Sequence, residues 1–359
     1  MIKIFLIFSL IISFSFSKEA SLEEMVGQMI MVGVGGNKPD DKWVKQLESD
    51  IKKAKVGGVI LFSKNIESPK KLKKLTSFFS SIKTKHPLLI AIDQEGGKVQ
   101  RLNEKNGFKL YPSAFEISKN KTLLQSYDIY KNMADELKEY NFNINFAPVV
   151  DLNINPNSPA IGASLRSYSE QEEIVIAYSS EFLRAQKDAG IISVLKHFPG
   201  HGSAMHDSHK RLTDVSNTWQ YRELKPYYNF IKYEKADAVM VGHINLVKFD
   251  KIYPASLSKK MVQGLLREQL GFGGVVFSDD MQMKAISDIY GFEQSVILAI
   301  NAGVDVLVYS SYFTQKSSVI KEVTQIILKA VKSGNIDIKT IQSSYKRITR
   351  LKNAIDMEK

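Results

Sequence analysis

Short apolar segments recur eight times along this chain of 359 residues, and a polar or glycine-rich turn follows each of them. Each segment is four to eight residues long, which is the length of a buried strand and too short for most helices. Strands that are apolar on both faces are typical of parallel sheets, whose connections require helices. The eight candidate strands are residues 29–34, 58–62, 88–92, 143–150, 191–195, 238–241, 274–277 and 304–309.

Most segments between these strands have the length and apolar period of a helix. A shorter helix is expected to begin at Ser21, which forms a capping-box pattern with Glu24. Eight strands alternating with helices predict an α/β fold, namely a single (β/α)₈ TIM-type barrel. The candidate helices are residues 68–85, 123–140, 170–189, 219–235, 259–270, 292–301, 319–331 and 338–351.

A doubly wound open sheet is the competing architecture. It is disfavoured because residues 32–36, Val-Gly-Val-Gly-Gly, lack the Gly-x-Gly-x-x-Gly spacing that follows the first strand of such sheets. The polar strand-end residues are also spread over many strands, whereas an open sheet gathers them near one switch point. No Gly/Ser-rich or Pro-rich linker interrupts the series, so we expect one domain.

The N-terminus has the pattern of a secretory signal peptide. Lys3 is followed by an apolar run of 13 residues, 4–16, and by small residues at Ser15 and Ser17. This run is too short to span a bilayer comfortably, although an uncleaved anchor is the alternative. We therefore expect residues 1–17 to be removed and residues 18–359 to form the barrel. The mature protein is expected to be periplasmic or secreted, with no stable membrane span.

The chain is basic, with 49 Lys and Arg against 38 Asp and Glu, and loses one lysine with residues 1–17. Such a balance favours nucleic acid or an anionic polymer such as cell wall. No nucleic-acid-binding motif is present, and the lysines of residues 70–74 are interpreted as a solvated helix face. We therefore expect no nucleic-acid partner, and a monomer. The absence of cysteine excludes disulfides and lipoprotein attachment.

Polar residues follow the ends of five candidate strands, and in a barrel these ends share one mouth. Nucleophilic serine chemistry is unsupported, because no Gly-x-Ser-x-Gly motif occurs. His197 and His201 have the spacing of a metal-binding pair, but Pro199 and Gly200 argue against the helix that would align them. The strand-end segments are Asp93 to Gly97, Asp151, Lys196-His197, His243 and Ser278-Asp279-Asp280.

Carboxylate-based catalysis on a polar substrate is the chemistry that remains. Asp279 is a candidate nucleophile, because a strand end holds a carboxylate rigidly. In Asp207-Ser208-His209 the aspartate can orient the imidazole for proton transfer. We expect Asp280 to be a structural neighbour, and His201 and His206 to shape the loop. His243 is either a sugar contact or a satisfied strand-end histidine.

Four segments make the chain resemble the family 3 glycoside hydrolases, and within them the bacterial β-N-acetylglucosaminidases of the NagZ type. The resemblance implies a barrel in which Asp279 forms a glycosyl-enzyme bond. It also implies that His209 is the acid/base and Asp207 its partner. The matching segments are residues 93–101, residues 145–151, residues 196–202 with Asp207-Ser208-His209, and residues 278–281.

The resemblance further implies a group of residues that hold the hydroxyls and acetamido group of N-acetylglucosamine. It implies no metal and no organic cofactor. The expected activity is that of a retaining exo-β-N-acetylglucosaminidase, or β-N-acetylhexosaminidase, acting on peptidoglycan fragments. The implied sugar-holding residues are Asp93, Arg101, Arg166, Lys196 and His197.

Three features depart from the family pattern. Ser203-Ala204 stands where the family usually has Asp-Thr, residues 161–167 are about two residues longer than usual, and the chain carries an export signal whereas familiar relatives are cytoplasmic. The alternatives are a family 3 β-glucosidase, a phosphorolytic N-acetylglucosaminidase, and a catalytically silent wall-binding barrel.

Overall fold

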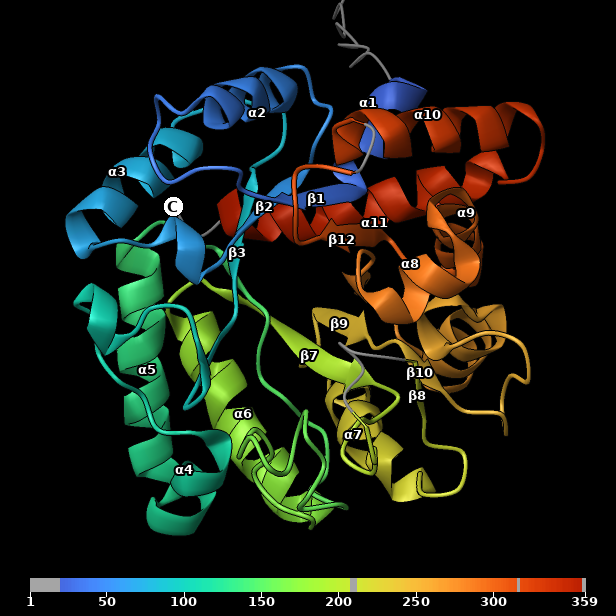
Figure 1. The fold of residues 1–359 in the computed structure, drawn as a ribbon. Coiled ribbons are helices and arrows are strands. Elements are labelled where there is room, and N and C mark those ends of the chain that lie inside the picture. The colour runs from blue at the N-terminus through green and yellow to red at the C-terminus, as the bar shows by residue number, and fades with distance from the viewer. Residues whose placement is uncertain (1–19, 207–211, 315–316, 357–359) are drawn as a thin grey trace, which may run out of the picture.

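Eight parallel strands close into a barrel with helices around it (Figure 1). The computed structural model describes residues 20–206, 212–314 and 317–356. The strand order is β1-β12-β11-β9-β7-β6-β3-β2, and β1 closes the barrel by pairing with both β2 and β12. The predicted (β/α)₈ fold is thereby confirmed. The strands are β1 Ile30–Gly33, β2 Gly58–Leu61, β3 Leu89–Ile92, β6 Ile144–Asn145, β7 Ile192–Phe198, β9 Ala238–Val241, β11 Val275–Asp280 and β12 Val306–Tyr309.

Three strands differ from the predicted bounds in ways that matter for the mouth. Only Ile144–Asn145 of residues 143–150 forms a strand, and Pro148 in this segment has no N–H to donate to a neighbouring strand. In contrast, β7 continues through Phe198 and β11 through Asp280. Lys196, His197 and Asp279 therefore lie on the strands themselves, where the pairing of β7 with β9 and of β11 with β12 is interrupted by an irregularity.

Most helices fall where the apolar period predicted them. The N-terminal capping box is present, since Glu24 N donates to Ser21 Oγ and Ser21 N donates to Glu24 Oε2 at 2.7 Å. Three helices of the structure, α2, α4 and α8, were not predicted from the sequence. The helices are α1 Leu22–Gln28, α2 Lys42–Lys52, α3 Pro69–Ser80, α4 Ala114–Asn120, α5 Leu123–Glu139, α6 Glu172–Asp188, α7 Lys225–Lys232, α8 Lys284–Tyr290, α9 Phe292–Ala302, α10 Val319–Lys332 and α11 Ile338–Asp356.

Two expected helices have a different form. Residues 219–235 were expected to form one helix, but the chain makes a 3₁₀ turn, η3 Tyr221–Leu224, before α7. Pro226 accounts for the break, because proline is tolerated only in the first turn of a helix and lacks a backbone N–H. Residues 259–270 form a π-helix, Lys260–Gln269, in place of an α-helix.

Two small sheets extend the mouth beyond the barrel strands. The hairpin of β4 Gln94–Gly96 and β5 Val99–Gln100 follows β3 directly. Asn145 anchors this hairpin, because its side-chain amide exchanges two 3.0 Å hydrogen bonds with the backbone of Gln94. The second sheet pairs β8 Thr213–Asp214 with β10 Ile244–Asn245 in parallel.

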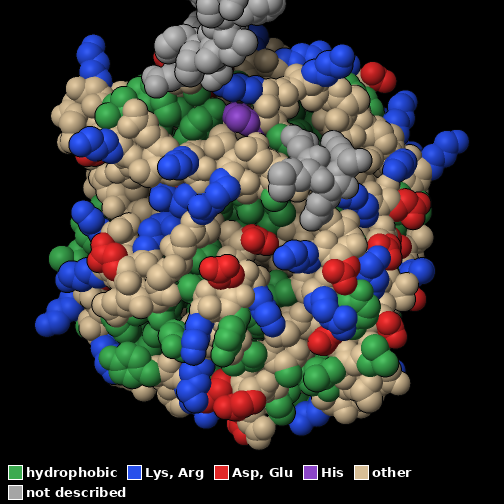
Figure 2. Space-filling model, turned by 180° about the vertical axis from the view of Figure 1, so that it is seen from behind, with side chains coloured by type: hydrophobic (Ala, Val, Ile, Leu, Met, Phe, Trp, Pro, Cys, Tyr) green, Lys and Arg blue, Asp and Glu red, His purple; other side chains and the backbone are tan. Residues whose placement is uncertain are grey.

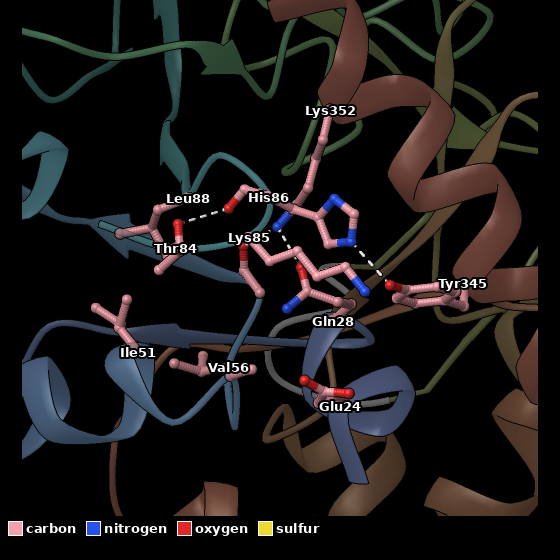
Figure 3. A pocket seen from close by; sticks show the side chains of 12 residues that line it. Glu24, Gln28, Ile51, Val56, Thr84, Lys85, His86, Leu88, Tyr345 and Lys352 are labelled. Carbon is pink, nitrogen blue, oxygen red and sulfur yellow. Dashed lines mark hydrogen bonds between the residues drawn. The ribbon is translucent and has the colours of Figure 1, made fainter. Parts of the chain in front are cut away.

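Helix α11 crosses the opposite end of the barrel, where the strands begin. Lys352 Nζ donates to Gln28 Oε1 and to the carbonyl of Gly57, both at 2.7 Å, beside the hydrogen bond between His86 and Tyr345 (Figure 3). Burial lowers the pKa of Lys352 to about 7. Figure 3 shows a pocket at this end of the barrel, and none of the site residues expected from the sequence lines it.

Charged side chains are spread over the surface. Figure 2 shows Lys and Arg side chains over the face opposite to that of Figure 1, with Asp and Glu among them. None of the helices in the described part of the chain is long and apolar enough to cross a membrane.

Candidate active site

Lys196 is the centre of an ion-pair network at the mouth of the barrel. Its ammonium group lies 2.9 Å from Asp93 Oδ1 and 2.6 Å from Glu95 Oε1, and the residue is 2% exposed. Asp93 follows β3, Glu95 lies on β4, and Lys196 lies on β7. Burial leaves Lys196 little access to water, so the two carboxylates supply the stabilisation that its charge requires.

Two arginines extend this network from other loops. Arg101 Nη2 binds Asp93 Oδ2 at 2.9 Å, and Arg166 binds Glu95 through Nε and Nη2, both at 2.8 Å. The second pair is bidentate, which fixes the guanidinium plane as well as its position. Arg166 therefore belongs to the network, although the segment that contains it, residues 161–167, was expected to depart from the family pattern.

Asp151 organises the histidine side of the mouth. Its carboxylate lies 2.8 Å from His197 Nδ1 and accepts hydrogen bonds from the backbone N–H groups of His197 and His201. The rings of His197 and His201 meet edge to face, with centroids 5.8 Å apart. His197 Nε2 lies 3.5 Å from Arg166 Nη2, so both halves of the mouth form one network.

The charges of this network balance. Burial acts to raise the pKa values of Asp93, Glu95 and Asp151, but the groups hydrogen-bonded to each of them outweigh it and lower all three. For Glu95, Arg166 and Lys196 bring the pKa to about 2. The three carboxylates of the network are matched in number by Lys196, Arg101 and Arg166, although Asp151 itself pairs with His197. Burial, and then the neighbouring His197, lowers the pKa of His201 to about 4, which leaves His201 neutral. A site of this kind suits a neutral ligand rich in hydroxyl groups.

Asp279 lies near the end of β11 and is partly exposed. Its Oδ1 accepts a 2.8 Å hydrogen bond from the backbone N–H of Asp280. Asp280 points to different partners, because its Oδ1 accepts from the backbone of Gln282 and of Ser310, both at 3.0 Å. Asp279 therefore keeps a carboxylate at the mouth, whereas Asp280 ties the loop after β11 to the loop after β12.

His243 follows β9 and is fully buried. Its Nδ1 lies 2.7 Å from Ser256 Oγ, and its Nε2 lies 3.0 Å from the carbonyl oxygen of Asp280. Of the two alternatives for His243, a sugar contact or a strand-end histidine with hydrogen bonds inside the protein, these contacts match the second.

The structure unites five predicted residues, Asp93, Arg101, Arg166, Lys196 and His197, in one connected network. Asp207 and His209, the expected acid/base pair, lie outside the described residues. In the segments that are described, no group of three or more His, Asp and Glu side chains could hold a metal ion.

Two carboxylates are central to the network, although the sequence indicated only that they lie at the mouth and suggested no role for them. Glu95 joins Lys196 to Arg166, and Asp151 fixes His197. Glu223 was missed altogether, although it is 1% exposed and lies beneath the turn of residues 199–204. Its position in a 3₁₀ turn far from any strand end gave no signal in the sequence.

The turn of residues 199–204 packs too closely to admit a side chain at Gly202. A Cβ atom there would lie 1.5 Å from the carbonyl oxygen of Leu152. We expect Gly202→Ala to lower the free energy of unfolding by about 3 kcal/mol or more, because backbone must shift to relieve the clash. Gly273→Ala is the control, since a Cβ atom at Gly273 meets nothing within 4 Å. Urea unfolding of both variants checks this, and equal stabilities would contradict it.

Comparisons with known proteins show which proteins the chain is similar to. Residues 21–351 match the family model described as "Glycosyl hydrolase family 3 N terminal domain". The chain is 32% identical over 336 residues to beta-hexosaminidase A of Pseudoalteromonas piscicida. This match covers 86% of this chain and 55% of that protein. It is 37% identical over 259 residues to a beta-hexosaminidase of Tolumonas auensis, covering 70% of this chain and 75% of the relative.

A solved structure is similar over nearly the whole chain. It is a glycoside hydrolase family 3 beta-N-acetylglucosaminidase from Paenibacillus sp., with a TM-score of 0.86 and 34% identity. The match covers 95% of this chain and 64% of that one. The chain therefore spans slightly more than half of the Pseudoalteromonas relative and less than two thirds of the Paenibacillus protein.

Proposed function

Because the chain belongs to glycosyl hydrolase family 3, we propose that it is a retaining exo-β-N-acetylglucosaminidase. The observation that carries this proposal is the charge-balanced network around Lys196, which shares the barrel mouth with the strand-end carboxylate of Asp279. The names of the relatives support the choice of an N-acetylated sugar.

The proposed reaction has two steps. Asp279 attacks the anomeric carbon while His209, oriented by Asp207, protonates the leaving oxygen, so that the glycosidic bond breaks and a glycosyl ester forms. His209 then takes a proton from water, whose oxygen attacks the same carbon and releases the Asp279 carboxylate. Two inversions at one carbon leave its configuration unchanged.

The network around Lys196 would hold the sugar during both steps. Asp93 and Glu95 offer carboxylate oxygens, and Arg101, Arg166 and Lys196 offer N–H donors, to hydroxyl and acetamido groups. Because these groups are already paired with one another, they are oriented before the substrate arrives. A sugar that exchanges hydrogen bonds with them need not reorganise the site.

The natural substrate that we propose is a peptidoglycan fragment with a terminal N-acetylglucosamine. The basic charge of the chain suits an acidic wall polymer. Export to the periplasm or the medium goes with this substrate, and the signal pattern of residues 1–17 supports it. N-terminal sequencing of the mature protein should begin near Lys18, and a mature chain beginning at Met1 in the cytosol would contradict export.

Hydrolysis of chromogenic glycosides tests the activity directly. We expect the mature protein to release nitrophenol from the β-N-acetylglucosaminide much faster than from the β-glucoside, with no acceleration by phosphate. Faster glucoside cleavage would favour a β-glucosidase, and sugar phosphate as product would favour a phosphorylase. Binding without turnover of either substrate would favour a silent wall-binding barrel.

A further inference from the structure

Glu223 lies on η3, directly beneath the turn of residues 199–204, and is 1% exposed. Its Oε1 accepts a 3.1 Å hydrogen bond from the backbone N–H of Gln220. The N–H and hydroxyl groups of Ser203 lie close enough to lower the pKa of this carboxyl group, although Glu223 Oε2 and Ser203 Oγ make no hydrogen bond to one another. A carboxylate with donors on two segments can hold those segments together.

The fit between η3 and the turn is close at two further points. Gly200 has a φ of +120°, and a Cβ atom there would lie 2.7 Å from Glu223 Cβ and 2.9 Å from Glu223 Oε2. Trp219 Nε1 donates to the carbonyl of Pro199 at 3.1 Å. On the barrel side, Asp151 accepts from the backbone N–H of His201 at 2.8 Å. The turn is therefore held between two buried carboxyl groups.

The burial of the Glu223 carboxyl group lowers the stability of the fold when that group is ionised. Burial raises the pKa of Glu223 to about 7, although the hydrogen bond from Gln220 and the neighbouring Ser203 act in the opposite direction. The charged groups that face it add to the effect, since Asp151 raises its pKa, and Tyr227 is the other titratable group nearby. A folded-state pKa above the unfolded value of 4.5 means that ionisation destabilises the fold as pH rises through this range. Buried acids of this kind cluster at functional sites.

We propose that Glu223 is a positioning residue that, with Asp151, fixes the turn of residues 199–204 and thereby the orientation of His197 toward the sugar. The contact between the rings of His201 and His197 transmits the position of the turn, because His201 belongs to it. This inference rests on the proposed function for its kinetic consequences, whereas the hold on the turn is independent of activity.

The ionised form of Glu223 should hold the turn most firmly. A carboxylate accepts from Gln220 and attracts the N–H and hydroxyl groups of Ser203 with its full negative charge, whereas a protonated carboxyl group attracts them less strongly. Activity should therefore rise with pH through an ionisation near 7, and the turn should tighten in the same range.

Tryptophan fluorescence reports on the turn without any substrate. The chain has two tryptophans, so Trp43→Phe leaves Trp219, which binds the turn at Pro199, as the single reporter. We expect the Trp219 emission to titrate with a midpoint near pH 7. Addition of Glu223→Gln should remove this titration. A midpoint that survives Glu223→Gln would overturn the proposal.

Kinetics of two variants test the consequence for the sugar. In Glu223→Gln an amide NH₂ group, which is itself a donor, replaces one of the two acceptor oxygens. We therefore expect kcat/KM at pH 8 to fall about tenfold, mainly through KM. Glu223→Leu removes all acceptors and should lower kcat/KM about 100-fold while the melting temperature at pH 8 stays the same or rises. Loss of activity without loss of stability distinguishes positioning from a structural role.

Glu136→Gln is the matched control. Glu136 is a partly buried glutamate on α5 whose pKa is likewise raised by burial, and its partner is Tyr111. Its kcat/KM should stay within about twofold of the parent value. Unchanged kcat/KM in both Glu223 variants would overturn the proposal. If the parent protein hydrolyses no N-acetylglucosaminide, the proposed function fails, and the fluorescence titration decides alone on Glu223.

Discussion

Replacement of Asp279 with asparagine should abolish turnover, with kcat on a chromogenic N-acetylglucosaminide falling on the order of 10⁴-fold or more. The amide cannot form the glycosyl ester, so the first chemical step has no nucleophile. Because Asp279 is partly exposed and asparagine keeps an oxygen that can accept the 2.8 Å hydrogen bond from the backbone N–H of Asp280, the fold should survive. Steady-state kinetics and circular dichroism check both expectations.

Asp280→Asn is the control for this experiment, because it changes the adjacent residue in the same way. Asparagine keeps the oxygen that accepts from Gln282 and Ser310, so kcat should fall less than about tenfold. Mass spectrometry after incubation with a fluorinated N-acetylglucosaminide inactivator should find the label on the peptide that contains Asp279. Label on Asp280, or an active Asp279→Asn enzyme, would contradict the assignment.

Replacement of Lys196 with methionine should lower the free energy of unfolding at pH 7 by about 3 to 5 kcal/mol. The substitution keeps the length of the side chain but removes the cation between Asp93 and Glu95, and so leaves two largely buried carboxylates with one arginine each. Urea unfolding at pH 7 gives the difference. The exposed Lys98, which donates to the carbonyl of Ala163, provides the control variant Lys98→Met, with a change within about 0.5 kcal/mol.

The effect of Lys196→Met should depend on pH with a definite sign. Lys196 helps to lower the pKa values of Asp93 and Glu95 below their unfolded values, so its contribution is present above about pH 4.5 and is lost as pH falls toward 2. The parent protein and the variant should therefore differ most near neutrality and converge in acid. A difference that is constant between pH 7 and pH 3 would mean that Lys196 stabilises the fold by packing and not by charge.

The barrel could be predicted from the sequence because its strands are buried on both faces. Continuous apolar segments such as Ala238–Val241 leave little doubt about burial, and their alternation with helical periods admits few topologies. The first and last residues of some elements could not be predicted from the apolar pattern. Pro226 divided a helix that looked continuous, and β7 and β11 both extend beyond their continuous apolar runs into polar residues.

The mouth could be predicted for a similar reason, since parallel strands in a barrel end at the same side. The sequence alone therefore predicted that Asp93, Lys196 and Asp279 lie at the same mouth. Their partners could not be assigned in the same way. Lys196 binds Asp93 across 103 positions of sequence, and Arg166 binds Glu95 across 71, and no local period encodes such pairs.

The sequence by itself therefore determined the barrel, the end of it that carries polar groups, and the residue types available there. The type and the burial of each element follow from the period of its apolar residues, which is a local property. The tertiary structure decided which charges pair, that Asp280 and His243 tie loops together, and that Glu223 lies beneath the turn of residues 199–204. These depend on distances of a few ångströms between segments far apart in the chain, which packing of the whole barrel sets.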